Sequence, residues 1–245
     1  MPTRRRLIIA GFLTLFAGLV ILFPARVAYN WFAPPGIAMS RIDGTIWSGS
    51  AKHLSAGGVY ATNVRWHSRP LHLLAGRLAF AVEGNLVSGF IESDLAFGFG
   101  GDIYLSELKG SVSVQLLEHA TGIAGLQGIL NIQFDRLQLS DGLPVAATGV
   151  AEVSGLLIPL VSQTPIGGFR AEFFTQQDGV VASIEDSNGI FDLAGSLRIS
   201  SDRNYQFLGL VAAKPETPPQ IREQMRFLGS PNERGQYELR LEGQL

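Results

Sequence analysis

Cysteine is absent from this chain, and charged residues are scarce. Without cysteine, the protein forms no disulfide, no thiolate metal site and no cysteine nucleophile. Only 16% of its 245 residues are charged, whereas an average globular protein has about 25%. The formal net charge is −2, so the composition gives no electrostatic reason to expect nucleic acid as a partner.

Catalytic and metal-binding motifs are also lacking. The sequence has no Gly-x-Ser-x-Gly elbow, and the glycine-rich segment 98–102 lacks the Lys-Ser/Thr ending of a phosphate loop. The four histidines are His53, His67, His72 and His119. His67 and His72 would point to opposite faces of a strand, which is unsuited to a shared metal ion. We therefore expect no catalytic residue, no metal ligand and no cofactor, and a protein that is not an enzyme.

One long hydrophobic run is present, near the N-terminus. Arg4, Arg5 and Arg6 precede Leu7–Phe23, which contains 17 residues and no charge. This length is at the lower end of the roughly 17–25 residues that cross a bilayer. The arginines are expected to stay in the cytoplasm. The run therefore predicts a transmembrane helix that anchors the chain, with the remaining residues on the other side of the membrane.

A cleaved signal peptide is the alternative interpretation, because its basic start and apolar core look the same. A cleavage site needs small residues at alternate positions, whereas Ala25 and Ala28 are three residues apart. We therefore expect an uncleaved anchor. Beyond it, Tyr29, Trp31 and Phe32 suit either the membrane interface or the start of the soluble core.

From Ile37 onward, apolar and polar residues alternate with a period of two. The alternation is clear in four segments: 77–83, 111–116, 190–200 and 236–245. Successive side chains of a strand point to opposite faces, so each segment predicts a half-buried strand. Hairpin turns are predicted at Asp141-Gly142, Asp178-Gly179 and Asn188-Gly189, and in segments 200–204 and 232–235. The fold class is therefore mainly β, a curved antiparallel meander.

Two short helical pieces are expected within this meander. Segment 217–229 has Thr217 as a predicted N-cap, Gln220 in position for a capping box, and Gly229 at its end. Segment 114–128 is predicted as a strand that runs into one helical turn and a glycine-rich corner. The chain thus divides into a basic tip (1–6), a transmembrane helix (7–23), a juxtamembrane linker (24–36) and a β domain (37–245).

The stretch from Arg41 to Ala51 places Trp47 between two glycines, Gly44 and Gly49. It predicts a strand in which Trp47 fills the base of the core, while the glycines let another backbone pass closely. The alternative is an exposed docking residue, since tryptophan is enriched in binding hot spots.

This stretch resembles the signature of the type II (general) secretion pathway protein N family. Further landmarks of that family follow in order along the chain. The matching residues are Ala33, Pro34, Gly44, Thr45, Trp47, Gly49, Ala51, Trp66, Pro70, Leu73, Leu74, Gly76, Phe227, Leu228, Gly229, Pro231, Gly235 and Tyr237. The segment from about Glu92 to Gly128 matches only loosely.

The resemblance implies a single-span protein of the inner membrane with a periplasmic β domain and with other secretion-machine subunits as partners. It brings no catalytic residues. The architecture is also similar to AsmA-like periplasmic proteins, whose curved sheets present an apolar groove. Two hypotheses follow: an accessory component of a type II secretion machine, or a lipid-binding module with phospholipid as its ligand. The sequence leaves open whether the sheet closes into a sandwich.

Overall fold

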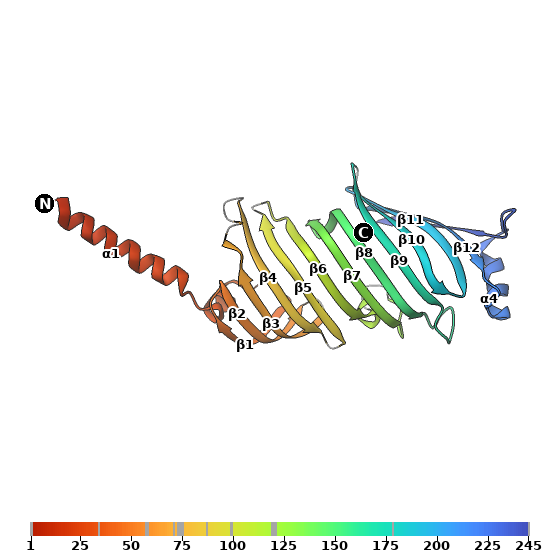
Figure 1. The fold of residues 1–245 in the computed structure, drawn as a ribbon, viewed down its shortest axis with the longest axis horizontal. Helices are drawn as coiled ribbons and strands as arrows, with labels where there is room; N and C mark the ends of the chain where they lie inside the picture. The colour runs from red at the N-terminus through yellow and green to blue at the C-terminus, as the bar shows by residue number, and fades with distance from the viewer. Residues whose placement is uncertain are drawn as a thin grey trace.

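The structure, a computed structural model, describes residues 2–33, 35–56, 59–70, 72, 76–86, 88–98, 100–118, 122–177 and 179–244. It contains one antiparallel sheet of 13 strands in which each strand pairs with the strands before and after it in the chain (Figure 1). The strands are β1 (Ile37–Gly44), β2 (Ser48–Ala56), β3 (Val59–Ser68), β4 (Arg77–Leu86), β5 (Gly89–Gly98), β6 (Ile103–Ser113), β7 (Gln127–Ser140), β8 (Leu143–Leu157), β9 (Gly167–Gln176), β10 (Gly179–Gly189), β11 (Phe191–Ser200), β12 (Asn204–Ala213) and β13 (Tyr237–Gln244). The predicted antiparallel meander is confirmed.

Two of the predicted turns, Asp141-Gly142 and segment 200–204, join consecutive strands, whereas segment 232–235 lies between Leu228 and β13. Asp141 and Gly142 connect β7 to β8 with φ values of 49° and 79°, as a two-residue hairpin of type I′ requires. Segments 200–204 and 232–235 also form turns. The prediction at Asn188-Gly189 is wrong, because these residues extend β10 past a bulge and pair with Gly168 and Gly167.

The predicted strand at 111–116 is also shorter than expected. Strand β6 ends at Ser113, and Val114–Leu117 form the 3₁₀ helix η2. The hydroxyl of Ser113 accepts a hydrogen bond from the backbone N–H of Gln115, which satisfies one of the donors at the start of η2. The cap formed by Ser113 therefore ends strand β6, although the apolar alternation of the sequence continues beyond it.

Helix α1 (Pro2–Ile21) projects away from the β1 end of the sheet (Figure 1). It includes most of the hydrophobic run but ends at Ile21, before Phe23, and its first turns carry Arg5 and Arg6. Among the helices that the structure describes, none is both long and apolar enough to cross a membrane. A transmembrane helix over Leu7–Phe23, as the sequence predicts, is therefore not found.

The segment predicted as a linker contains a second helix, α2 (Ala25–Phe32), which packs on β1. Ala25 is buried together with Ile42 and Ala51. The hydroxyl of Tyr29 accepts a hydrogen bond from the backbone N–H of Met39 at 3.0 Å. Part of this segment therefore belongs to the folded domain, because the apolar side of α2 packs against apolar side chains of the sheet.

The predicted C-terminal helix forms as α4 (Pro219–Gln224) followed by the 3₁₀ helix η3 (Met225–Leu228). Its predicted N-cap is wrong: Pro218 occupies that position, without a side-chain hydrogen bond. Thr217 is buried, and its hydroxyl donates to the carbonyl oxygen of Ile190 instead. This bond ties the helix to the β10–β11 connection.

Candidate functional site

One face of the sheet is mostly apolar from β4 to β13. Residues directly opposite each other on paired strands share a face, so a row can be followed from strand to strand. One such row crosses β6 to β13 and contains only apolar residues and glycine: Leu108, Phe134, Gly149, Phe173, Ala182, Leu197, Phe207 and Leu241. A parallel row starts in β4: Gly84, Ile91, Gly110, Ile132, Ala151, Ala171, Ile184, Gly195, Gly209 and Leu239. We call this side the apolar face.

The opposite side is mostly polar, and we call it the polar face. One row crosses all 13 strands: Asp43, Ser50, Arg65, Glu83, Glu92, Lys109, Gln133, Val150, Glu172, Ser183, Ser196, Leu208 and Arg240. The alternation in the sequence therefore separates two chemically different surfaces.

The apolar face is only partly covered. Within the described residues, contacts between strands join mainly neighbours in the meander, so the sheet is a single layer and not a sandwich. Phe134 and Phe173 pack with ring centroids 5.2 Å apart in its central cluster. Leu78, Phe97 and Leu241 on the same face remain 38%, 42% and 60% exposed. A surface of this kind fits an apolar partner or ligand better than bulk water.

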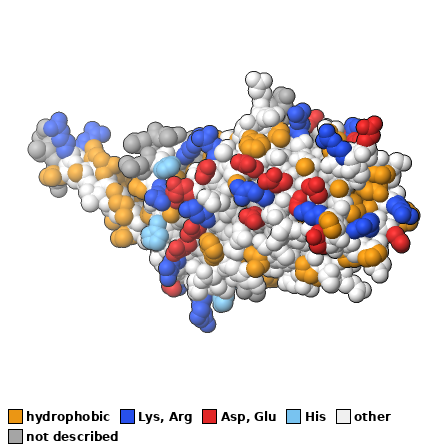
Figure 2. All heavy atoms as spheres, turned by 45° about the vertical axis from the view of Figure 1, so that its right-hand side comes forward, with side chains coloured by type: hydrophobic (Ala, Val, Ile, Leu, Met, Phe, Trp, Pro, Cys, Tyr) orange, Lys and Arg blue, Asp and Glu red, His pale blue; other side chains and the backbone are white. Residues whose placement is uncertain are grey.

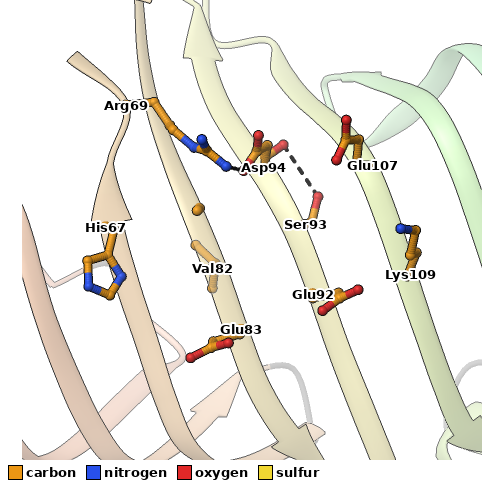
Figure 3. Close-up of a pocket in the computed structure, with 10 residues that line it drawn as sticks. His67, Arg69, Val82, Glu83, Glu92, Ser93, Asp94, Glu107 and Lys109 are labelled. Carbon is orange, nitrogen blue, oxygen red and sulfur yellow. Dashed lines mark hydrogen bonds and ion pairs between the residues drawn. The ribbon is translucent and has the colours of Figure 1, made fainter. Parts of the chain in front are cut away.

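The polar face carries a charged depression of about 380 Å³ between β3 and β6 (Figure 3). Arg69 and Asp94 form an ion pair at 3.0 Å across it. Glu83 and Glu92 lie directly opposite each other on β4 and β5, and Lys109 faces Glu92 from β6. Positive and negative side chains are mixed over the side of the molecule seen in Figure 2.

The chemistry of this depression favours contact with a polar surface. The hydroxyl of Ser93 donates to the backbone carbonyl oxygen of Ser106 at 3.2 Å, so it is held by the backbone and not by a histidine base. The depression thus presents charged side chains of both signs with one ion pair, Arg69–Asp94, which suits recognition of a charged partner more than nucleophilic chemistry.

The glycine–tryptophan stretch forms the junction between α1 and the sheet. Thr45 to Trp47 connect β1 to β2, so Trp47 is not in a strand and is half-buried, contrary to the predicted core position. Its indole Nε1–H donates to the carbonyl oxygen of Val20 at 2.8 Å. The indole Nε1–H of Trp66 donates to the carbonyl oxygen of Thr45 at 3.2 Å.

Steric crowding explains why position 49 in this junction is a glycine. A Cβ placed on Gly49 would lie 2.5 Å from Cζ2 of Trp66 and 2.6 Å from the carbonyl oxygen of Asp43. Gly44 has a φ of 90°, which disfavours any side chain. The small residues thus let the ring of Trp66 lie against the β1–β2 hairpin.

The structure brings together only part of the predicted signature. Gly44, Thr45, Trp47, Gly49 and Trp66 meet at the junction. The others lie elsewhere: Pro70 and Gly76 are in the β3–β4 connection, and Gly229 and Gly235 lie between η3 and β13. Pro34, Leu73, Leu74, His119, Asp178 and Leu245 lie outside the described residues.

The sequence did not predict an ion pair that links β10 to the end of β12. Lys214 and Asp186 form a salt bridge, and the second oxygen of Asp186 accepts from the backbone N–H of Leu193 at 3.0 Å. Burial raises the pKa of Asp186, but the hydrogen bond from Lys214, the bond from Leu193 and the charge of Lys214 lower it below its ordinary value. The two residues are 28 positions apart in the chain, so no local pattern reveals the contact.

Comparison with known proteins identifies the family. Residues 35–240 match the family described as type II secretion system (T2SS), protein N. The chain belongs to this family. It is 25% identical over 256 residues to the type II secretion system protein N of Vibrio cholerae serotype O1, with 94% of each chain covered. It is 24% identical over 249 residues to the protein of the same name from Aeromonas hydrophila, with 98% of each covered.

The family is a component of secretion machinery and is not known as an enzyme. The matched range 35–240 begins just before β1 and ends within β13, so it includes nearly the whole sheet. No solved structure matches the chain. The expected likeness to AsmA-like proteins is therefore not supported by any comparison.

Proposed function

We propose that the protein is an accessory, non-enzymatic component of a type II secretion system that is anchored in the inner membrane and holds its sheet in the periplasm. The observation that carries the proposal is the family match over residues 35–240. The charged polar face is then the surface that contacts other subunits, since charges on one protein that complement charges on its partner give specificity to the contact.

The anchoring role of α1 is supported by its surface. Side chains from Leu7 to Leu22 are mostly apolar and exposed, with Phe12 at 68% and Leu22 at 70%. They are distributed around the whole helix and do not form one stripe. A helix that is apolar on all sides is typical of burial in protein or lipid, and nothing else in the described chain packs along it.

The apolar part of α1 is short for a helix that crosses a bilayer. Sixteen residues from Leu7 to Leu22 extend about 24 Å as a helix, which is shorter than a hydrocarbon core of about 30 Å. Local thinning of the bilayer and extension of Arg5 and Arg6 to the interface would accommodate the difference.

The experiment that tests the secretion role is complementation. A strain that lacks the gene is expected to export less of its type II substrates into the medium, and the full chain should restore export. Glu92→Lys, in the charged depression, should restore it less well than the matched control Glu216→Lys, which is exposed near α4. Normal export in the deletion strain would contradict the proposal.

A lipid-binding module is the second candidate, favoured by the uncovered apolar face. It is tested by placing the photoreactive residue p-benzoylphenylalanine at Leu78 on this face and at Leu208 on the polar face, which are 38% and 39% exposed. After irradiation in cells, phospholipid adducts at Leu78 and none at Leu208 are expected. Equal labelling at both positions, or none, would refute a lipid-binding face.

A further inference from the structure

The apolar face ends in an open pocket beneath α4 and η3. This pocket has a volume of about 340 Å³ and lies between these helices, the β8–β9 connection and strands β9, β11, β12 and β13. Of its 12 lining residues, only Gln224 is polar. Leu193, Val211 and Leu239 form its floor from the apolar face, and Ile221 and Met225 cover them.

The position of the cover is fixed by contacts outside the pocket. Thr217 donates to the carbonyl oxygen of Ile190, and the backbone N–H of Lys214 donates to the same oxygen at 3.0 Å. Arg222 Nη2 donates to the carbonyl oxygen of Lys214 at 3.1 Å. The helix is therefore held over the sheet by its own connection, and its apolar side chains do not fill the space beneath it.

The lining restricts the class of ligand. No charged side chain lines the pocket, so a polar molecule would lose its hydrogen bonds to water on entry without replacement. Exposed apolar side chains flank the opening: Leu160 on the β8–β9 connection is 80% exposed, and Leu228 on η3 is 44% exposed. A hydrocarbon group therefore meets favourable contacts both at the opening and inside.

Continuity with the membrane end of the molecule favours an acyl chain over a protein side chain as the occupant. The floor of the pocket lies on the same face of the sheet as the apolar rows, which extend back to β4. On β3 and β1, Trp66 and Met39 pack in the buried cluster that contains Ala25 of α2, the helix that follows α1. We propose that the pocket beneath α4 binds the hydrocarbon chain of a membrane phospholipid. This proposal rests on the second candidate function and on the anchor formed by α1.

The test uses the full chain in cells with p-benzoylphenylalanine at Leu228. The polar-face position Leu208, which is 39% exposed, serves as the matched control. Irradiation, purification and mass spectrometry are expected to give a phospholipid adduct at Leu228 and none at Leu208. Leu160, on the other wall of the opening, replaces Leu228 if that variant does not accumulate.

A pocket-narrowing variant separates this site from the rest of the face. Val211→Phe should abolish the adduct at Leu228 while the adduct at Leu78 persists, and Val150→Phe on the polar face should change neither. An adduct with the mass of a free fatty acid, and none with the mass of a phospholipid, would overturn the phospholipid as the occupant. A protein adduct at Leu228, or lipid at Leu78 without lipid at Leu228, would overturn the pocket proposal. Lipid at neither position would overturn the lipid-binding function as well.

Discussion

The indole nitrogen of Trp47 donates a hydrogen bond to the carbonyl oxygen of Val20 at 2.8 Å, and this bond joins α1 to the sheet. Val20 lies in the last turn of α1, where carbonyl groups lack partners within the helix. The backbone N–H of Ile46 donates to the carbonyl oxygen of Phe23 at 3.1 Å beside it. The tryptophan, with small residues on either side of it, therefore caps the end of α1.

Replacing Trp47 should remove the hydrogen bond between α1 and the β1–β2 connection but lower the free energy of unfolding of the domain only modestly. Because Trp47 is half-buried, Trp47→Phe should lower the free energy of unfolding by about 1 kcal/mol, the value of one net hydrogen bond. Trp47→Ala should cost less than the roughly 3–5 kcal/mol of a fully buried aromatic side chain. Urea unfolding of the purified chain measures both, and a loss near the larger value would place Trp47 in the core.

Gly49→Ala should destabilise the β1–β2 hairpin, because the added methyl group would lie 2.5 Å from the ring of Trp66 and 2.6 Å from a backbone oxygen. We expect a loss of about 1–3 kcal/mol in the free energy of unfolding. Gly100→Ala is the control, since nothing lies within 4 Å of a Cβ placed there. Equal thermal midpoints for the two variants would argue against the close approach of Trp66.

Asp186→Asn should remove a pH-dependent contribution to stability. The folded pKa of Asp186 is lowered, so its carboxylate stabilises the fold above the unfolded pKa of about 3.9 and loses this effect as the pH falls through the folded pKa. The variant should be less stable at neutral pH by about 1–3 kcal/mol, and its stability should fall less on acidification. Denaturant unfolding between about pH 5 and pH 3 tests this, with Glu216→Gln as an exposed control.

Replacing Arg4, Arg5 and Arg6 with glutamate should disturb the orientation of the proposed membrane anchor, because basic residues near a membrane helix are retained in the cytoplasm. In the parent protein, protease added to the periplasmic side should reach the sheet. In the variant, a fraction of the chains should become protected. Unchanged accessibility would contradict the role of these arginines.

Local patterns predicted the strands well. Period-two alternation depends only on the geometry of an extended chain, so β4, β11 and β13 could be located from their own residues. Asp141-Gly142 was predictable for a similar reason, since few residues accept positive φ. The prediction of Thr217 as N-cap was wrong because its hydroxyl donates to the carbonyl oxygen of Ile190, which is distant in the sequence. A tertiary hydrogen bond thus replaces the local one.

Local sequence patterns establish the antiparallel meander with one apolar and one polar side, because alternation and turn residues act over a few neighbouring positions. Tertiary contacts determine the rest: the sheet stays a single layer, Trp47 caps α1, Trp66 packs against Gly49, and α4 leaves a pocket over the apolar face. These outcomes depend on which distant surfaces meet, and on the shape complementarity of side chains from different strands, which no local period encodes.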